Sequence, residues 1–164
     1  MQKTIYLVRH AKSSWEHPGL ADIDRPLNNR GKKNAPEMGS RLKNQQIFPD
    51  LLISSPAKRA YNTALAMAEE IGYSKEDIVI DDDLYHGGEQ SLFDIIRGQN
   101  EEYQSIMLFF HNPGITWFSN QLCNFYIANI PTAGVVSIGI STPWNKVTAG
   151  SGELIFFDYP KKGW

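Results

Sequence analysis

The chain has 164 residues, of which 41% are hydrophobic and 12% aromatic; this suits one globular domain over residues 1–164 and excludes a disordered chain. A polar start and the lack of an apolar run of about 18 residues argue against a signal peptide and a membrane span, and one cysteine excludes a disulfide framework, so a cytoplasmic protein with no membrane partner is predicted. The net charge is −2 and there is no basic stripe with interleaved aromatic residues, so nucleic acid is not an expected partner.

Basic residues are concentrated in the first part of the chain. Residues 1–63 carry eleven Lys or Arg against five Asp or Glu, whereas the remainder carries five against thirteen. Anion-binding groups are therefore expected in the first part, with scattered surface charge as the alternative explanation.

The first predicted strand ends in two polar residues. Residues 4–8 form an apolar run typical of a central parallel strand covered on both faces, and Arg9 and His10 follow it. Because open α/β sheets bind ligands at the carboxyl ends of their strands, both side chains are expected to face a cleft. A neutral imidazole can act as a nucleophile and a guanidinium can bind an anion, although a supporting histidine in the core is the alternative.

A predicted helix adds a second arginine. Ser55 suits its N-cap, Pro56 its first position and Gly72 its end, which places Arg59 in the first turn. The start of a helix already attracts anions, and basic residues normally prefer the other end. An anion site therefore explains Arg59 better than an ordinary surface position does.

The stretch after the third predicted strand contains two candidate proton donors. Residues 84–89 are expected to form a flexible connection, and His86 and Glu89 are its titratable groups that could swing over a cleft. The three aspartates at 81–83 are interpreted as a solvated turn, because successive side chains diverge and no other metal-ligand pattern accompanies them.

The most apolar strand, residues 105–110, also ends in a polar group. His111 follows it directly, and Asn112 and Pro113 can cap and begin the next helix. His111 is therefore expected in the same kind of position as His10, at the carboxyl end of a strand beside the start of a helix.

Strands and amphipathic helices alternate along the chain, which indicates the α/β class. The expected strands cover residues 4–8, 50–55, 77–80, 105–110, 135–140 and 153–157, and the expected helices include 32–45, 56–71 and 91–98. We predict a three-layer α/β/α sandwich with a central, mostly parallel sheet of about six strands and helices on both faces. The last two strands are expected as an antiparallel edge pair.

The converging residues suit a dianionic phosphoryl group. Neutral His10 would attack phosphorus and carry the group as a covalent intermediate, while Arg9, Arg59 and a cationic His111 would stabilise the oxygens. Water would then hydrolyse the intermediate, and no metal or cofactor is expected because the arginines and histidine supply the positive charge. Lys12 and Ser13, in the loop after His10, are further predicted substrate-binding residues.

Four blocks of the sequence resemble the histidine phosphatase superfamily, specifically its small SixA-like phosphohistidine phosphatase branch. They are residues 7–15, then Arg25, Pro26 and Leu27 with Gly31, then residues 54–63, and finally His111, Asn112 and Pro113. The resemblance implies that His10 is the phosphoryl acceptor and that Arg9, Arg59 and His111 complete the phosphate pocket. Ala11 stands where the superfamily usually has glycine, and its usual acidic proton donor has no clear match.

The missing acid favours a phosphohistidine substrate, because an imidazole can leave already protonated whereas an alkyl phosphate needs a donor. The leading hypothesis is a metal-independent phosphohistidine phosphatase that acts on a phosphorelay-type protein. The alternatives are a phosphomonoesterase for a small phosphorylated metabolite, with Glu89 or His86 as acid, and a phosphate-binding module without turnover.

Overall fold

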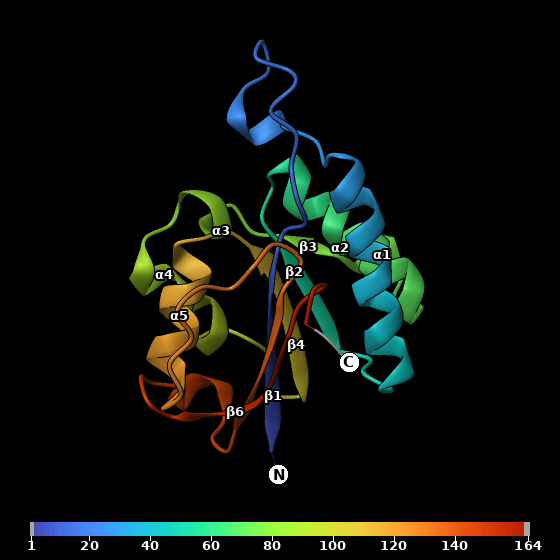
Figure 1. Ribbon diagram of the computed structural model, residues 1–164. Helices are drawn as coiled ribbons and strands as arrows, with labels where there is room; N and C mark the ends of the chain where they lie inside the picture. The colour runs from blue at the N-terminus through green and yellow to red at the C-terminus, as the bar shows by residue number, and fades with distance from the viewer. Residues whose placement is uncertain (1, 163–164) are drawn as a thin grey trace.

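The computed structural model describes residues 2–162, which form a six-stranded mixed sheet with helices on both faces (Figure 1). The strands are β1 (Lys3–Arg9), β2 (Leu51–Ser54), β3 (Val79–Ile80), β4 (Ser105–Phe110), β5 (Val135–Ile140) and β6 (Gly152–Asp158). The helices are α1 (Asn29–Asn44), α2 (Lys58–Ile71), α3 (Asp83–His86), α4 (Glu89–Arg97) and α5 (Gly114–Leu122). The predicted α/β class and layered arrangement are confirmed.

The strand order is β3-β2-β4-β1-β5-β6. Neighbours among the first four strands are parallel, whereas β5 runs antiparallel to both β1 and β6. The expected antiparallel edge pair is therefore present. Because β2, β4 and β1 are adjacent and parallel, their carboxyl ends meet at one edge of the sheet, and this brings together the residues that follow them.

Alternate residues of the central strands supply two hydrophobic cores. In β1, Ile5 and Leu7 pack into one core with α4 and α5, whereas Val8 packs into the other with α1 and α2. The same alternation in β4 sends Leu108 to the first core and Phe109 to the second. This period of two explains why both strands are apolar throughout: each of their faces is covered by a helical layer.

Three helix starts differ from the sequence prediction. The first helix begins at Asn29 rather than residue 32, because the Asn28 side chain accepts a hydrogen bond from the Gly31 amide at 2.8 Å and caps it. Helix α2 begins at Lys58, so Ser55 is not its N-cap. Helix α4 begins at Glu89 rather than residue 91, and α3 takes up residues 84–86 of the expected flexible connection, which leaves Gly87 and Gly88 between the two helices.

Within residues 2–162, no helix is both long enough and apolar enough to span a lipid bilayer. In the same part of the chain, no three His, Cys, Asp or Glu side chains are grouped as metal ligands would be.

Candidate active site

The polar residues that follow β1 and β4 lie side by side. Arg9 is the last residue of β1 and pairs in register with Phe110, the last residue of β4, so His10 and His111 leave the sheet at the same level. Their ring centroids are 5.2 Å apart. Arg59 lies in the first turn of α2, as predicted, and is buried at the same edge. The structure therefore brings together all four residues that the sequence predicted as catalytic.

The loop after β1 is held by close backbone contacts. The Ala11 amide donates to Thr63 Oγ1 at 2.9 Å, and this hydroxyl donates to the Arg59 carbonyl at 2.8 Å, which ties the loop to α2. On its other side the loop lies against α1, where a Cβ on Gly31 would come within 2.1 Å of the Lys12 carbonyl oxygen. Glycine at position 31 is therefore needed for this close approach.

His10 is oriented as a neutral nucleophile. Its Nδ1 lies 2.8 Å from the Ala11 carbonyl oxygen, which can only accept, so we assign the ring hydrogen to Nδ1 and a free lone pair to Nε2. Burial lowers the pKa of His10 to about 4, and the positive charges of Arg59 and Arg9 act in the same direction. The imidazole is therefore unprotonated at neutral pH, which is the form that a nucleophile requires.

A cavity of about 180 Å³ lies in front of His10. Its basic lining consists of Arg9, Lys12, Arg25 and Arg59, all from the first 63 residues, where the sequence placed the excess of positive charge. The buried Nε of Arg9 has no hydrogen-bond partner, while its Nη1 donates to the Ile130 carbonyl at 2.9 Å. A cavity with this lining is suited to a small anion.

Ser13 and Arg25 form one wall of this cavity. The predicted substrate-binding residues Lys12 and Ser13 both line it, and the Ser13 hydroxyl accepts a hydrogen bond from Arg25 Nη2. The Arg25 guanidinium also packs on the Trp15 ring, 3.3 Å from its centroid. The sequence analysis assigned no role to Arg25. Its presence in one of the four blocks that resemble the superfamily was a signal that could have identified it.

Asp22 is the second residue that sequence reasoning missed. Its carboxylate accepts hydrogen bonds from Arg25 Nη1 at 2.9 Å, Arg59 Nη2 at 3.0 Å and the Tyr85 hydroxyl at 2.7 Å. The Tyr85 hydroxyl and the two guanidinium groups lower the pKa of Asp22 well below its usual range. Asp22 therefore stays ionised and fixes the site arginines and Tyr85 relative to one another.

In the ligand-free site, His111 does not carry the charge that was expected of it beside a phosphoryl group, and the cationic form with a bound ligand stays a prediction. Burial, followed by the charges of His10 and Arg59, lowers the pKa of His111 to about 3, so the residue is neutral at neutral pH in the ligand-free site. Ser55 Oγ lies 2.8 Å from Nε2 and accepts the Ala57 amide, which leaves its own hydrogen free for Nε2. We therefore assign the ring hydrogen to Nδ1, a buried atom without a protein partner that remains available to a ligand.

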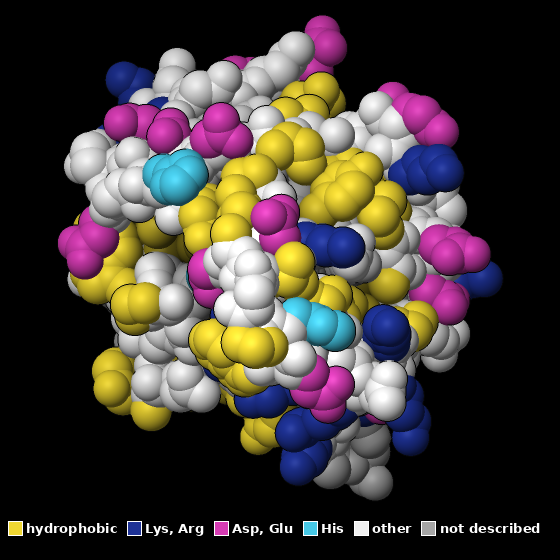
Figure 2. All heavy atoms as spheres, turned by 90° about the horizontal axis from the view of Figure 1, so that it is seen from above, with side chains coloured by type: hydrophobic (Ala, Val, Ile, Leu, Met, Phe, Trp, Pro, Cys, Tyr) yellow, Lys and Arg dark blue, Asp and Glu magenta, His cyan; other side chains and the backbone are white. Residues whose placement is uncertain are grey.

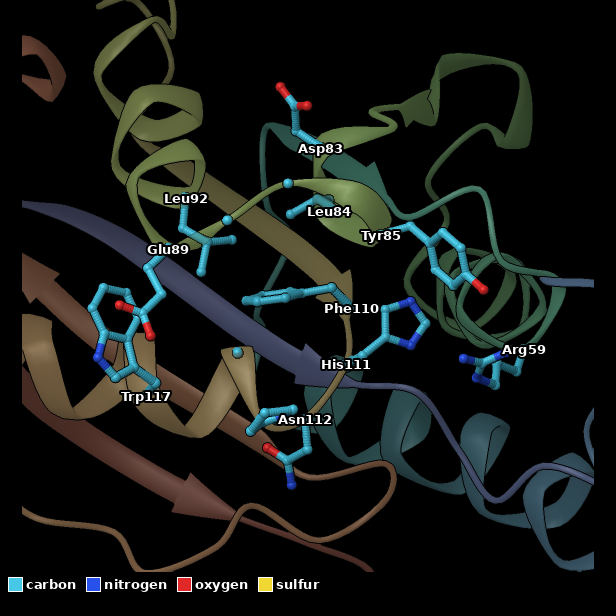
Figure 3. A pocket seen from close by; sticks show the side chains of 14 residues that line it. Arg59, Asp83, Leu84, Tyr85, Glu89, Leu92, Phe110, His111, Asn112 and Trp117 are labelled. Carbon is cyan, nitrogen blue, oxygen red and sulfur yellow. The ribbon is translucent and has the colours of Figure 1, made fainter. Parts of the chain in front are cut away.

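A larger groove of about 520 Å³ adjoins the anion cavity and shares Arg59, His111 and Asn112 with it. Figure 3 shows Tyr85 beside His111 and Arg59 at one end of this groove, and Glu89 beside Trp117 at the other end. Seen onto the carboxyl ends of the strands, hydrophobic side chains gather around an imidazole and several basic groups (Figure 2).

The two candidate proton donors are not placed with the four converging residues. Glu89 lines the groove, but its side chain points toward Trp117 and away from His111 (Figure 3). His86 is exposed and lines neither cavity; its ring packs edge-on against Tyr85 with centroids 4.6 Å apart. A general acid must reach the leaving atom, so an acid role for either residue stays a prediction.

Comparisons with known proteins match most of the chain to one superfamily. A model of the histidine phosphatase superfamily (branch 1) matches residues 5–129. The chain is 42% identical over 89 residues to phosphoserine phosphatase 1 of Hydrogenobacter thermophilus, covering 51% of this chain and 39% of that enzyme. The chain thus spans well under two thirds of this curated relative's length.

Solved structures match over nearly the whole chain. A protein of Agrobacterium tumefaciens assigned as the phosphohistidine phosphatase SixA is 29% identical, with a TM-score of 0.81 over 96% of this chain and 98% of that one. A similar assignment from Nakamurella multipartitia has a TM-score of 0.83 over 98% of each chain, at 19% identity, which shows a shared fold.

Proposed function

The chain belongs to the histidine phosphatase superfamily, and on that premise we propose that it is a phosphatase that uses His10 as a covalent nucleophile. The Nε2 lone pair of His10 attacks phosphorus while the bond to the leaving group breaks, and the electron pair of that bond departs with the leaving group. Water then attacks phosphorus, the bond to Nε2 breaks, and inorganic phosphate is released. The observation that carries this proposal is the Nδ1 contact to the Ala11 carbonyl, which leaves Nε2 unprotonated.

The arginines provide the electrostatic part of the mechanism. Arg9, Arg25 and Arg59 line the cavity in which the phosphoryl oxygens would lie, so positive charge is already in place before the reaction. Three guanidinium groups can balance the charge of a dianion, and the proposed reaction therefore needs no metal ion. His111 Nδ1 is a further donor to a phosphoryl oxygen.

For the substrate, we propose a protein phosphorylated on histidine. The relative from Agrobacterium tumefaciens, aligned over 96% of this chain, supports this choice. The geometry supports it too, because neither Glu89 nor His86 lies beside the cavity, and a phosphorylated imidazole needs less help from an acid than an alkyl phosphate does.

A small-molecule phosphomonoesterase is the second candidate. Its support is the 42% identity to a phosphoserine phosphatase, which extends over 51% of this chain. The two candidates share the nucleophile and the arginines, and they differ only in the group that leaves phosphorus.

The test measures phosphate release from a histidine-phosphorylated protein, phosphoserine and an aryl phosphate, with a chelator present. Wild type should release phosphate from the first and the third, and His10→Ala should lose at least about 10⁴-fold in kcat. The exposed loop variant His17→Gln is the matched control and should behave as wild type. Rapid quenching should trap a phosphoryl label on wild type that is labile in acid and stable in base, as a phosphorus–nitrogen bond is.

Release from phosphoserine at a rate equal to or above that from phosphohistidine would favour the second candidate. Turnover that survives in His10→Ala, or no release from any of the three substrates, would overturn the proposed phosphatase mechanism.

A further inference from the structure

The groove beside the anion cavity differs from it in charge. The cavity is lined by four basic side chains, whereas the groove's described lining contains the acidic residues Asp83 and Glu89, and Arg59 is its one basic residue. Of the two acidic side chains, Asp83 points away from Phe110 and His111, whereas Glu89 lies over Trp117 (Figure 3). Arg59 is already bonded to Asp22 at the shared end. A substrate with its phosphoryl group in the cavity would therefore place its leaving group in surroundings that are apolar and acidic.

Flat aromatic and apolar side chains make up most of the groove's walls. They are Leu84, Tyr85, Leu92, Phe110, Pro113 and Trp117. Figure 3 shows Phe110 lying between the Tyr85 end and the Trp117 end. Such walls favour a planar ring, which can stack on aromatic faces or meet them edge-on.

Both aromatic ends of the groove are held in place. The Tyr85 hydroxyl donates to Asp22 at 2.7 Å, and its ring stands edge-on to His111 with centroids 5.5 Å apart. At the other end, Trp117 packs edge-on against Phe93 at 6.2 Å and lies nearly parallel to Phe118. Walls that are fixed before binding reduce the entropy cost of accepting a ring of matching shape.

From these features we infer that the groove is a leaving-group subsite that selects a planar, neutral or cationic ring and rejects leaving groups that carry a carboxylate or a second phosphate. The inference rests on the proposed phosphatase function and deepens it. The imidazole of phosphohistidine meets both criteria, since it is flat and becomes cationic when protonated. Phosphoglycerate is not planar and presents a carboxylate with no compensating cation to Glu89, so it meets neither criterion.

Glu89 is the specificity-determining residue in this scheme. Its carboxylate lies over the far end of the groove, where it repels an anionic leaving group through space and does not need to reach the reacting atoms. This separates charge selection from proton donation, because removing a general acid slows the poorest leaving groups most, whereas removing a repelling charge favours anionic leaving groups.

Two phosphonates that cannot be hydrolysed test the subsite without relying on turnover. Phenylphosphonate presents a planar ring and phosphonoacetate a carboxylate, and their dissociation constants can be measured by calorimetry beside that of inorganic phosphate. Wild type should bind phenylphosphonate at least about tenfold more tightly than phosphonoacetate, and Glu89→Lys should reduce that preference by about tenfold.

Asp94→Lys is the matched control, because Asp94 is exposed on the same helix and lines neither cavity. It makes the same change in net charge and should leave the preference as in wild type. The same change should appear in catalysis: Glu89→Lys should raise kcat/KM for phosphoglycerate relative to an aryl phosphate, whereas Asp94→Lys should not.

Equal binding of the two phosphonates by wild type, or the same preference in wild type and Glu89→Lys, would overturn the subsite while leaving the phosphatase function intact. Failure of inorganic phosphate and of both phosphonates to bind would instead count against the proposed function itself.

Discussion

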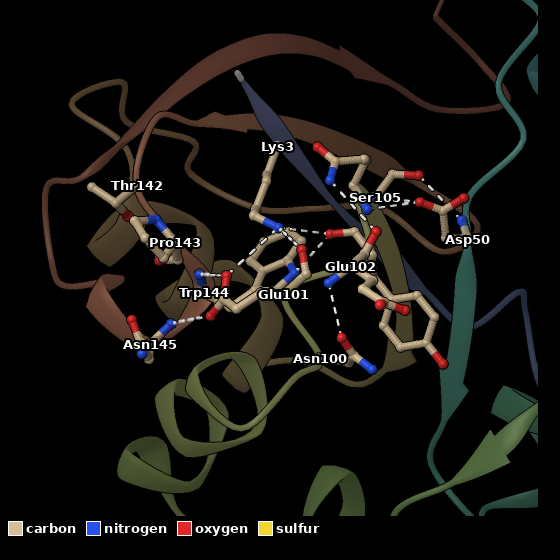
Figure 4. A network of polar contacts seen from close by, with 12 residues as sticks. Lys3, Asp50, Asn100, Glu101, Glu102, Ser105, Thr142, Pro143, Trp144 and Asn145 are labelled. Atoms are coloured by element: carbon tan, nitrogen blue, oxygen red, sulfur yellow. Dashed lines mark hydrogen bonds and ion pairs between the residues drawn. The ribbon is translucent and has the colours of Figure 1, made fainter.

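Buried polar side chains at the two ends of the central sheet differ in how they are bonded. At the amino ends of the parallel strands, Lys3 lies in a closed network of polar contacts (Figure 4), whereas at the carboxyl ends Arg9, His10 and His111 surround a cavity. Both ends contain buried polar side chains, so burial alone does not identify the functional end. The difference lies in which polar atoms already have partners.

At the amino end the polar groups are paired within the protein. Lys3 Nζ donates to the carbonyls of Glu101 at 2.6 Å and Tyr103 at 2.8 Å, and the Glu101 carboxylate lies 3.6 Å away. That carboxylate also accepts the amides of Trp144 and Asn145. Such a network joins the start of β1 to the segment after β5 and pairs the Lys3 ammonium with two carbonyls and a nearby carboxylate.

At the carboxyl end two buried nitrogens remain without partners, Arg9 Nε and His111 Nδ1. Leaving a buried polar group unpaired costs stability, and natural proteins tolerate that cost mainly where function requires it. The comparison therefore predicts that substitutions at the carboxyl end reduce activity more than stability, and that substitutions at the amino end do the reverse.

After the loss expected for His10→Ala, the largest expected effect is that of His111→Gln on turnover. Removing one donor that stabilises charge in a phosphoryl transition state should lower kcat by about 10²–10³-fold. Stability should fall by only about 1 kcal/mol, because the Ser55 Oγ contact of Nε2 is the hydrogen bond at risk and Nδ1 has no partner to lose. Aryl phosphate hydrolysis and urea unfolding measure the two effects. An unchanged kcat with a large loss of stability would contradict the prediction that the carboxyl end of the sheet serves activity rather than stability.

Lys3→Met tests the amino end and should have the opposite signature. It removes the donor to the Glu101 carbonyl and the ammonium beside the Glu101 carboxylate, whereas the Tyr103 carbonyl keeps its bond from Trp144 Nε1. The free energy of unfolding should therefore fall by about 1–3 kcal/mol, while kcat/KM on an aryl phosphate should stay within about twofold of wild type. The exposed Lys33→Met is the control and should change neither quantity. Wild-type stability in Lys3→Met would show that the network does not contribute as the contacts indicate.

The sequence predicts the position of this site better than its internal bonding. The apolar strands that end in His10 and His111 are local sequence patterns. Neighbouring parallel strands bring their carboxyl ends together independently of the conformation of the loops. The position of Arg59 likewise followed from helix start and stop signals, although the helix begins at Lys58 and Ser55 faces His111 instead of capping.

Asp22 could not be predicted in the same way. Its bonds join it to Arg59 and Tyr85, which are distant in sequence and meet it only because the loop after β1 folds over the sheet edge. The neutral state of His111 in the ligand-free site could not be predicted either, since a pKa of about 3 depends on how deeply the ring is buried and on its positive neighbours. Both features belong to the tertiary structure and leave no local sequence pattern.

The last and smallest expected effect is the pH dependence of sulfate binding. It tests whether the histidines at the carboxyl end of the sheet take up protons when an anion binds. With pKa values of about 4 for His10 and about 3 for His111, both rings are neutral in the free protein near neutral pH. A bound dianion raises both pKa values, so each ring that becomes protonated in the complex takes up a proton on binding. Sulfate stays a dianion over this range, and below the raised pKa its affinity should increase by up to about tenfold per pH unit for each such proton, about 1.4 kcal/mol.

Calorimetry in buffers of different ionisation enthalpy counts the protons taken up on binding, and His111→Gln should take up fewer than wild type. An affinity that is constant between about pH 7 and pH 5 would mean that the arginines hold the anion while both histidines stay neutral.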